Sequence, residues 1–376
     1  MSKTGIPSIR FRGFDDAWEQ RKLGKLVDVC SGRDYKHLSE GTIPVYGTGG
    51  YMLSVNDALS YDRDAIGIGR KGTIDKPYIL KAPFWTVDTL FYAIPREKVD
   101  LNFAFDIFQN IDWKKKDEST GVPSLSKTAI NDIDVLAPKH GEQQTIGQFF
   151  AGIDHLITLH QRKFEKLTNV KKSMLEKMFP QNGSCYPAVR FKGFTSPWEQ
   201  RKFGDVFEEY SEKNRADLPP LTIIQGSGTI RRDESERALQ YDKASLSNYK
   251  VVNEGDLIVH LRSFEGGLEK ANSQGIISPA YHTFHGEGVD SRFYYTYFRS
   301  KNFIDIDLKP HVYGIRDGRS IDIEGMKTIE IPFTSYPEQK LIGDAIDSIN
   351  TLISLQRREL EKLQSTKKAL LEKMFV

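Results

Sequence analysis

Apolar residues recur every seven positions in two long segments of the chain, from Glu142 to Phe179 and from Glu338 to Phe375. In both segments a second such position follows four residues after the first, and the pattern persists over five repeats. Sustained heptad spacing predicts helices that pair as a coiled coil, each on the order of 55 Å long. The predicted helix-pairing positions are Ile146, Ile153, His160, Leu167 and Met174 in the first helix and Ile342, Ile349, Gln356, Leu363 and Leu370 in the second.

Two polar residues, His160 and Gln356, occupy matching positions in these stripes. A polar residue in such a seam usually fixes register or strand number, so we interpret His160 as neither a ligand nor a catalyst. Additional leucines widen both stripes and leave apolar surface for further helices. The same two helices are therefore expected to serve for partner docking as well as for pairing. The additional leucines are Leu156, Leu159, Leu352 and Leu355.

The sequence is duplicated. The segment from Pro7 to Asp28 agrees with the segment from Pro187 to Glu208 at about half of its positions, and the two helical segments agree to a similar extent. Between these anchors, Asp64 to Arg70 matches Asp256 to Arg262 more weakly. Each half is thus one variable lobe followed by one long helix. The predicted division is lobes at residues 1–140 and 181–335, a central spacer helix at 141–180 and a C-terminal spacer helix at 336–376.

Each lobe is predicted to be a mixed α/β (α+β) domain, because short β-like runs alternate with turns rich in glycine and proline. Trp18 and Trp198, one at the start of each lobe, are expected to be buried anchors rather than exposed stacking surfaces. The expected strands are Asp64–Ile68, Thr86–Ile94, Val251–Leu261 and Ile276–Phe284, and the expected helices are Phe103–Ile111 and Phe293–Phe303.

Composition narrows the class of protein. A net charge of only +2 means that any affinity for nucleic acid must come from local basic patches or from a partner. The two cysteines, Cys30 and Cys185, exclude a disulfide framework and a four-cysteine zinc site and favour a reducing, cytoplasmic location. No apolar run approaches the roughly 20 residues that cross a bilayer, and Met1 to Arg10 lacks the apolar stretch of a secretion signal, so we expect no membrane association.

Known catalytic patterns are incomplete in this sequence. Gly67, Gly69 and Gly72 form a G-x-G-x-x-G string, but Pro77 and the β-branched residues before it disfavour the helix that a dinucleotide site requires. Residues 112–114 (Asp-Trp-Lys) are the nearest approach to a nuclease fragment, and a solvated charged loop is the simpler interpretation of Lys114 to Glu118. The eight histidines lack the pairing of a zinc helix. We predict no catalytic, cofactor-binding or metal site.

Both lobes contain loops that combine glycines, hydroxyl residues and basic side chains. Arginine can take the two acceptors of guanine, whereas Ser, Thr, Lys and backbone N–H groups suit phosphate oxygens. A duplicated frame whose loops differ most at Ser31–Ser60 and Ser211–Asn248 favours two readers of two different DNA half-sites. The candidate DNA-binding residues are Arg33, Tyr35, Lys36, Thr48, Arg70, Lys71, Thr73, Ser124, Ser126 and Lys127 in the first lobe and Gln225, Ser227, Arg231, Arg232, Arg262, Tyr313, Arg316 and Arg319 in the second.

In these features the chain resembles the specificity (S) subunit of type I restriction-modification enzymes. The resemblance covers nearly the whole chain and rests on three duplicated motifs, each modest alone and specific in this order. The motifs are the openings that end in WEQRK-x-G, the Glu-Gln start of each helix at Glu142-Gln143 and Glu338-Gln339, and the LEKMF ends at Leu175–Phe179 and Leu371–Phe375.

The resemblance implies two target-recognition domains that each read one part of a split, asymmetric sequence of double-stranded DNA. It implies spacer helices that set the gap and dock two copies of an adenine-N6 methyltransferase (M) subunit, which binds S-adenosylmethionine. Restriction (R) subunits, which use ATP and Mg, would join for cleavage. This chain would then be a non-catalytic recognition subunit without a cofactor of its own. Reading loops change with the target, so the candidate contact residues rest on local inference.

Two other interpretations stay open. A two-lobed adaptor that binds proteins would show no salt-steep DNA binding, whereas phosphate contacts lose affinity linearly in log salt. A stand-alone nuclease would cleave DNA in the presence of a divalent metal, and the missing carboxylate cluster argues against it.

Overall fold

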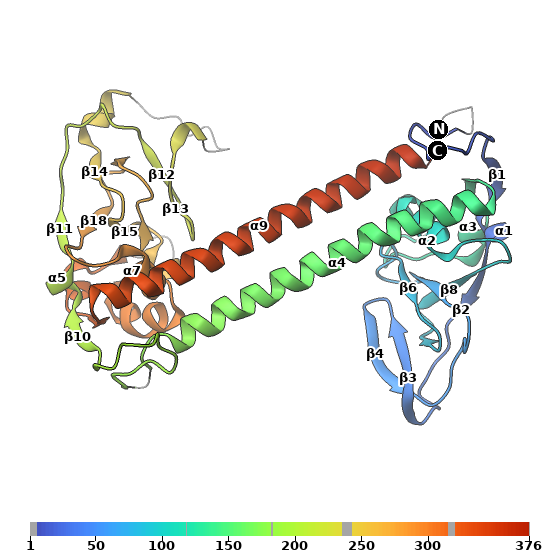
Figure 1. The fold of residues 1–376 in the computed structure, drawn as a ribbon, viewed down its shortest axis with the longest axis horizontal. Helices are drawn as coiled ribbons and strands as arrows, with labels where there is room; N and C mark the ends of the chain where they lie inside the picture. The colour runs from blue at the N-terminus through green and yellow to red at the C-terminus, as the bar shows by residue number, and fades with distance from the viewer. Residues whose placement is uncertain (1–5, 118, 182, 235–242, 315–319, 376) are drawn as a thin grey trace. The chain divides into compact units, whose positions relative to one another are not determined.

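The computed structural model describes residues 6–117, 119–181, 183–234, 243–314 and 320–375. The chain forms two compact units, residues 1–162 with 356–376 and residues 163–355. Each unit holds one mixed α/β lobe and parts of two long helices, α4 (His140–Lys177) and α9 (Tyr336–Met374) (Figure 1). The predicted fold class, two mixed lobes with two long helices, is confirmed.

A four-stranded antiparallel sheet forms the centre of the lobe in the first unit, and a smaller sheet lies beside it. The main sheet has the order β2 (Val27–Ser31), β8 (Leu90–Pro95), β5 (Ala65–Gly69), β6 (Tyr78–Leu80). The smaller sheet has the order β4 (Gly50–Val55), β3 (Glu40–Gly47), β7 (Trp85–Thr86), and β1 (Glu19–Lys22) pairs with β9 (Asp134–Ala137). The helices are α1 (Leu23–Leu26), α2 (Leu101–Asn110), η1 (Trp113–Lys116) and α3 (Lys127–Asn131).

The lobe of the second unit repeats this frame. Its main sheet has the order β11 (Glu208–Tyr210), β18 (His282–His285), β15 (Leu257–Val259), β16 (Glu269–Lys270), and β10 (Glu199–Lys202) pairs with β21 (Glu330–Phe333). The other strand pairs are β12 (Leu221–Ile224) with β13 (Gly228–Arg231), β14 (Lys250–Val252) with β17 (Gly275–Ile277), and β19 (Val312–Tyr313) with β20 (Ser320–Ile321). The helices are α5 (Phe203–Val206), η2 (Arg232–Glu234), η3 (Lys243–Asn248), α6 (Ser263–Gly266), α7 (Ser291–Phe298), η4 (Phe303–Leu308), η5 (Lys309–His311) and α8 (Ile323–Lys327).

Three of the four expected strand runs are interrupted by turns. The run expected from Val251 to Leu261 is broken because Asn253 donates its backbone N–H to the buried carboxylate of Asp256, and Gly255 adopts a left-handed conformation with φ 93°. The helix expected from Phe293 to Phe303 likewise ends at Phe298. Uniformly apolar runs do not show where a chain turns between two sheets.

A buried glutamate at the start of each long helix explains two of the duplicated motifs. Glu142 accepts hydrogen bonds from Arg10 at 2.7 and 2.8 Å and from the Trp18 indole at 3.3 Å. Glu338 does the same with Arg190 and Trp198. The tryptophan of each WEQRK opening is therefore a buried anchor, as predicted, and it ties the opening segment to the following helix.

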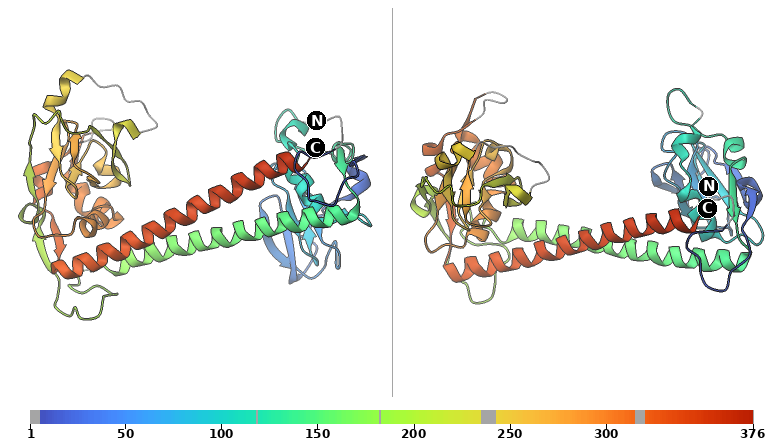
Figure 2. Two further views of the ribbon diagram at one scale, coloured as in Figure 1. Left: turned by 45° about the horizontal axis from the view of Figure 1, so that its top comes forward. Right: turned by 90° about the horizontal axis from the view of Figure 1, so that it is seen from above.

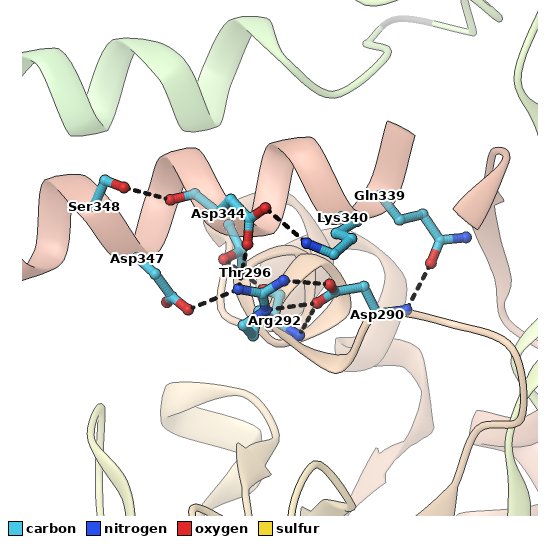
Figure 3. A network of polar contacts seen from close by, with 8 residues as sticks. All are labelled: Asp290, Arg292, Thr296, Gln339, Lys340, Asp344, Asp347 and Ser348. Atoms are coloured by element: carbon cyan, nitrogen blue, oxygen red, sulfur yellow. Dashed lines mark hydrogen bonds and ion pairs between the residues drawn. The ribbon is translucent and has the colours of Figure 1, made fainter. Parts of the chain in front are cut away.

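The second unit has an ion network at this junction, shown in Figure 3. Arg292 at the start of α7 binds Asp290 beside it and Asp344 of α9, both at 2.6 Å, and approaches Asp347 at 3.4 Å. The matching position of the first lobe holds Asn102, which cannot form such an ion pair. The two copies of the frame therefore differ in the polar contacts that attach each lobe to its long helix.

The end of each long helix completes the core of the lobe that precedes the other helix. Phe375, after α9, packs against Trp18, Phe103 and Phe150 of the first unit with ring centroids 5.5–6.1 Å apart. Phe179, after α4, packs in the same way in the second unit against Trp198 at 6.0 Å and Phe293 at 5.0 Å. Figure 2 shows the end of α9 at the lobe where the chain begins.

The helices pair antiparallel in the first unit. His160 of α4 bonds Gln356 of α9 through Nδ1 and Oε1 at 3.0 Å, while Asp154, earlier in α4, binds Lys367, later in α9. The heptad positions are buried or half-buried along both helices, and the positions between them are mostly exposed. Among the described residues no helix combines the length and apolar character needed to cross a bilayer.

Candidate nucleic-acid interface

Four predicted DNA-binding residues of the first lobe gather around one pocket. The loop after β5 and the loop before α3 run together, with Gly72 N donating to Pro123 O and Leu125 N to Arg70 O, both at 2.9 Å. The resulting pocket, of about 320 Å³, is lined by Arg70, Lys71, Asp88, Thr89, Ser124, Leu125 and Ser126. The two basic side chains and three hydroxyl groups around this pocket are suited to anionic oxygens, and Asp88 is the one acidic residue in its lining.

Backbone packing presents Arg70 outward. Gly69 is required before it, because a Cβ at that position would lie 1.9 Å from the carbonyl oxygen of Thr73. The Arg70 guanidinium lies 5.7 Å from the centroid of the Phe91 ring and remains exposed. Thr73 is exposed in the same loop, and Lys127 is half-buried at the start of α3.

The hairpin between β3 and β4 carries Thr48 at its tip. Tyr78 of β6 donates its hydroxyl to the carbonyl of Gly47 at 2.6 Å, and Gly50 closes the turn with φ 103°. Thr48 is half-buried, whereas Tyr51, just after the turn, is 64% exposed.

The remaining candidates of the first lobe lie in residues 33–36. The backbone there is fixed, since Arg33 N donates to Thr86 O and the Trp85 indole donates to Arg33 O, both at 2.9 Å. Arg33 and Lys36 are exposed, while Tyr35 packs against the small core that includes Val45.

In the second lobe the structure brings the hairpin tip and the arginine loop together. Gln225 and Ser227 are exposed at the tip between β12 and β13. The Gln225 amide lies over Gly266, where a Cβ would be 2.1 Å from its Nε2 atom. Arg262, four residues earlier, is exposed at the start of α6. Arg262 and Gln225 therefore belong to neighbouring loops, as Arg70 and Ser124 do in the first lobe.

His260 supports the arginine loop without carrying charge. Its Nδ1 accepts the backbone N–H of Arg262 at 3.3 Å. Burial, with the nearby charges of Arg299 and Arg262, lowers the pKa of His260 to about 4. The imidazole is therefore neutral at pH 7 and adds no charge beside Arg262.

The other candidates of the second lobe are more dispersed. Arg231 is exposed and paired with Asp233 at 2.8 Å, and Arg232 lies 5.3 Å from the Tyr249 ring centroid. Both sit at the end of β13 away from the hairpin tip. Tyr313 is 59% exposed in β19. Arg316 and Arg319 lie outside the described residues.

The structure adds two exposed aromatic residues to the candidates in the first lobe, Tyr51 and Tyr61, the second 62% exposed. Exposed aromatic rings beside basic loops can contact bases or sugars. The Gly-Gly-Tyr sequence of the hairpin was the available signal for Tyr51, and nothing local marked Tyr61. In the described part of the chain no group of three or more His, Cys, Asp or Glu side chains is placed to hold a metal ion.

Comparisons with known proteins agree with this architecture. Residues 15–169 match the family model of the type I restriction modification DNA specificity domain. Two curated relatives come from Methanocaldococcus jannaschii. The type I restriction enzyme MjaVIII specificity subunit is 25% identical over 278 residues, which span 69% of this chain and 65% of the relative. The putative type I restriction enzyme MjaX specificity subunit is 23% identical over 262 residues, which span 66% of this chain and 60% of the relative. The matches thus span less than two thirds of either relative.

A solved structure shares the fold. The S subunit of a type I restriction-modification system from M. genitalium superposes with a TM-score of 0.67 at 12% identity and covers 99% of both chains. The match to the family model covers the first lobe and most of α4, and the second lobe repeats its four-stranded sheet and the strand pair β1–β9 as β10–β21. The first lobe and most of α4 are thus similar in sequence to the type I restriction modification DNA specificity domain, and the chain shares the fold of the S subunit from M. genitalium.

Proposed function

We propose that this chain reads a bipartite, asymmetric sequence of double-stranded DNA, with one half-site bound by each lobe. The main support for the proposal is that the two lobes share one strand arrangement but have different loops. The sheet order β2-β8-β5-β6 recurs as β11-β18-β15-β16, while the hairpins and basic loops attached to it differ in sequence and contacts. Arg70 and Arg262 stand at matching positions after the central strands β5 and β15 and face different neighbours.

The proposal extends to the assembly partners. Leu156 and Leu159 are each 45% exposed on α4, and Leu352 and Leu355, at the matching positions of α9, are 42% and 47% exposed. Equivalent apolar patches suit two copies of one protein partner. We assign them to two methyltransferase subunits, which would supply S-adenosylmethionine and the catalytic residues. Restriction subunits with ATP and Mg would join that complex for cleavage, and the chain itself would act in the cytoplasm without catalytic activity.

The test is selection from a random duplex library at moderate salt, with this chain alone and with its co-purified methyltransferase subunit. A split motif with a constant gap is the expected result. If nothing is enriched while the methyltransferase is demonstrably bound, the proposal fails and the protein-binding adaptor is favoured. Metal-dependent cleavage by the purified chain would instead favour the stand-alone nuclease.

Lobe exchange tests the modular part of the proposal. Replacing residues 1–140 by the lobe of a relative is expected to change one half of the selected sequence and to leave the other half unaltered. A change in both halves would contradict the assignment of one half-site to each lobe.

A further inference from the structure

Glu269 is a fully buried carboxylate in the edge strand β16 of the second lobe, and it points at the backbone of the β12–β13 hairpin tip. Its two oxygens accept the N–H groups of Gly226 at 2.7 Å and Gly228 at 3.0 Å. Two backbone amides of a tight turn, one on each side of Ser227, thus converge on one side chain. Hydrogen bonds from backbone N–H groups to an ionised acceptor are among the stronger ones in proteins.

Two further side chains stabilise Glu269 in place. Tyr295 donates its hydroxyl to Oε2 at 2.8 Å, and Arg299 of the same segment forms an ion pair with Oε1. Burying an ionised carboxylate is unfavourable unless it is paired and hydrogen-bonded, and here a cation and three uncharged donors surround it. Glu269 is therefore a fixed attachment point for the hairpin.

The side chain of Asn272, three residues after Glu269, also holds this hairpin. The Asn272 side-chain amide donates to Ser227 O at 2.7 Å and to Thr229 O at 3.0 Å. Gly228 fits closely over this strand, because a Cβ there would lie 2.5 Å from Lys270 O. The side of the tip that faces β16 is thus fully occupied, whereas Gln225 and Ser227 are exposed.

The first lobe attaches its hairpin from the matching strand with different chemistry. Leu80 of β6 pairs with Ala65 as Lys270 of β16 pairs with Leu257, so Ile79 occupies the position of Glu269. The attachment is made by the adjacent Tyr78, whose hydroxyl donates to Gly47 O. In both lobes the edge strand of the main sheet holds the tip of the variable hairpin, once through a hydrogen-bond donor and once through an acceptor.

We infer that Glu269 is a positioning residue that sets the base preference of the second lobe by holding residues 224–228 against β16. The inference rests on the proposed function and deepens it. A displacement of the tip moves Gln225 away from Gly266 and from the Arg262 loop, so that the two loops no longer present one surface to a half-site. Glu269 itself faces inward and contacts no DNA.

The test compares the full chain, in complex with its methyltransferase subunit, with the variants Glu269→Gln and Asn272→Ala in the same library selection. The glutamine is isosteric but directs an NH₂ group at one of the two glycine N–H donors. Both variants are expected to lose discrimination by about tenfold or more at one or more base pairs of the second half-site. Preference within the first half-site should be unchanged.

Two controls separate positioning from folding. Tyr295→Phe removes one donor to Glu269 but leaves the bonds from Gly226 N and Gly228 N to the carboxylate, so it should lower the melting temperature while the selected motif stays intact. Tyr78→Phe should alter the first half-site only. Because Asn272 is exposed, its alanine variant will fold even if Glu269→Gln does not.

The outcomes are distinguishable. If the unmodified complex enriches no split motif, the proposed function fails. If it does, and Asn272→Ala and any folded Glu269→Gln protein retain full discrimination at the second half-site, the positioning role alone is overturned. Equal loss in both half-sites, or a loss matched by Tyr295→Phe, would also overturn it, because that pattern indicates general destabilisation.

Discussion

Arg190 and Glu338 are joined by two hydrogen bonds of 2.6 and 2.8 Å, and the glutamate side chain is fully buried at the start of α9. Glu338→Gln removes the charge that Arg190 faces and leaves a half-buried guanidinium without its carboxylate partner. We expect it to lower the free energy of unfolding of the second unit by about 3 kcal/mol. Hydrogen–deuterium exchange of the second unit measures this. The control is Glu199→Gln, which breaks an exposed pair with Arg201 and should change stability by less than about 1 kcal/mol. Equal effects of both variants would contradict the buried-pair argument.

Replacing each of two lysines at matching positions of the long helices by methionine should change the free energy of unfolding in opposite directions. Lys367 is buried and bonds Asp154 and Gln109, so Lys367→Met leaves Asp154 without its partner and should destabilise the first unit by about 1–2 kcal/mol. For Lys171, burial and the charge of Arg299 lower the pKa, and no carboxylate of the described residues offsets this effect.

Lys171→Met should therefore stabilise the second unit by up to about 1 kcal/mol, allowing for partial exposure. The sign follows from linkage, since a lysine whose folded pKa lies below its unfolded value is destabilising while both states are charged. Chemical denaturation of both variants at pH 7 makes the comparison. Destabilisation by both would show that the two positions are equivalent after all.

Arg70 and Arg262 should each affect a single half-site. If Arg70 contacts a base, Arg70→Ala should reduce discrimination in the first half-site by about 1–3 kcal/mol and leave the second unchanged, and Arg262→Ala should do the reverse. If the contact is to a phosphate, affinity should fall by the same factor for every DNA sequence. The slope of log affinity against log salt concentration should then fall in magnitude by about one. Binding titrations at several salt concentrations distinguish these cases. Arg21→Ala, at an exposed pair with Glu19 in β1, is the control and should leave both half-sites as they are.

Lowering the pH should reduce the stability of the second lobe, because His260 becomes protonated more readily in the unfolded chain. Its folded pKa, about 4, lies below the ordinary value of 6.5, so its contribution to stability is present above about pH 6.5 and is lost as the pH falls toward 4. Between pH 7 and pH 5 we expect a loss of about 1 kcal/mol, allowing for its partial exposure. His260→Asn keeps an acceptor for Arg262 N and does not titrate, so it should flatten this part of the profile. An NMR titration that gives His260 an ordinary pKa would refute the assignment.

Lengthening both long helices should change the spacing of the half-sites and leave their bases unchanged. We would insert one heptad into each helix at the level of the His160–Gln356 pair, because both helix ends are anchored in lobe cores. Each insertion adds about 10 Å, or about three base pairs of DNA. Library selection gives the gap directly. Replacing the same heptads without a change in length is the control, and an unaltered gap after a folded double insertion would contradict the role of the helices as a spacer.

The periodic and repeated features of this chain were predictable from sequence, and its long-range contacts were not. The heptad pattern predicted both helices because side-chain packing between paired helices repeats every seven residues. The duplicated opening segments predicted that Trp18 and Trp198 are buried. The turns at Asn253–Asp256 escaped prediction, since they depend on a buried carboxylate that takes a local amide. The approach of Gln225 to Gly266, and of Gly226 and Gly228 to Glu269, joins segments 41–43 residues apart, which no local pattern reveals. The domain boundaries and the DNA contacts stay predictions.

The position of Phe375 has a practical consequence for handling this protein. Ile9 N donates to Lys373 O beside it, as Val189 N does to Lys177 O, so the last turn of α9 is part of the framework that begins the chain. Shortening the chain before Leu371 would remove three buried side chains, Leu371, Met374 and Phe375, from the core around Trp18. A deletion or a bulky insertion within residues 371–375 would therefore disturb the core of the first lobe, although these residues are far from that lobe in the sequence.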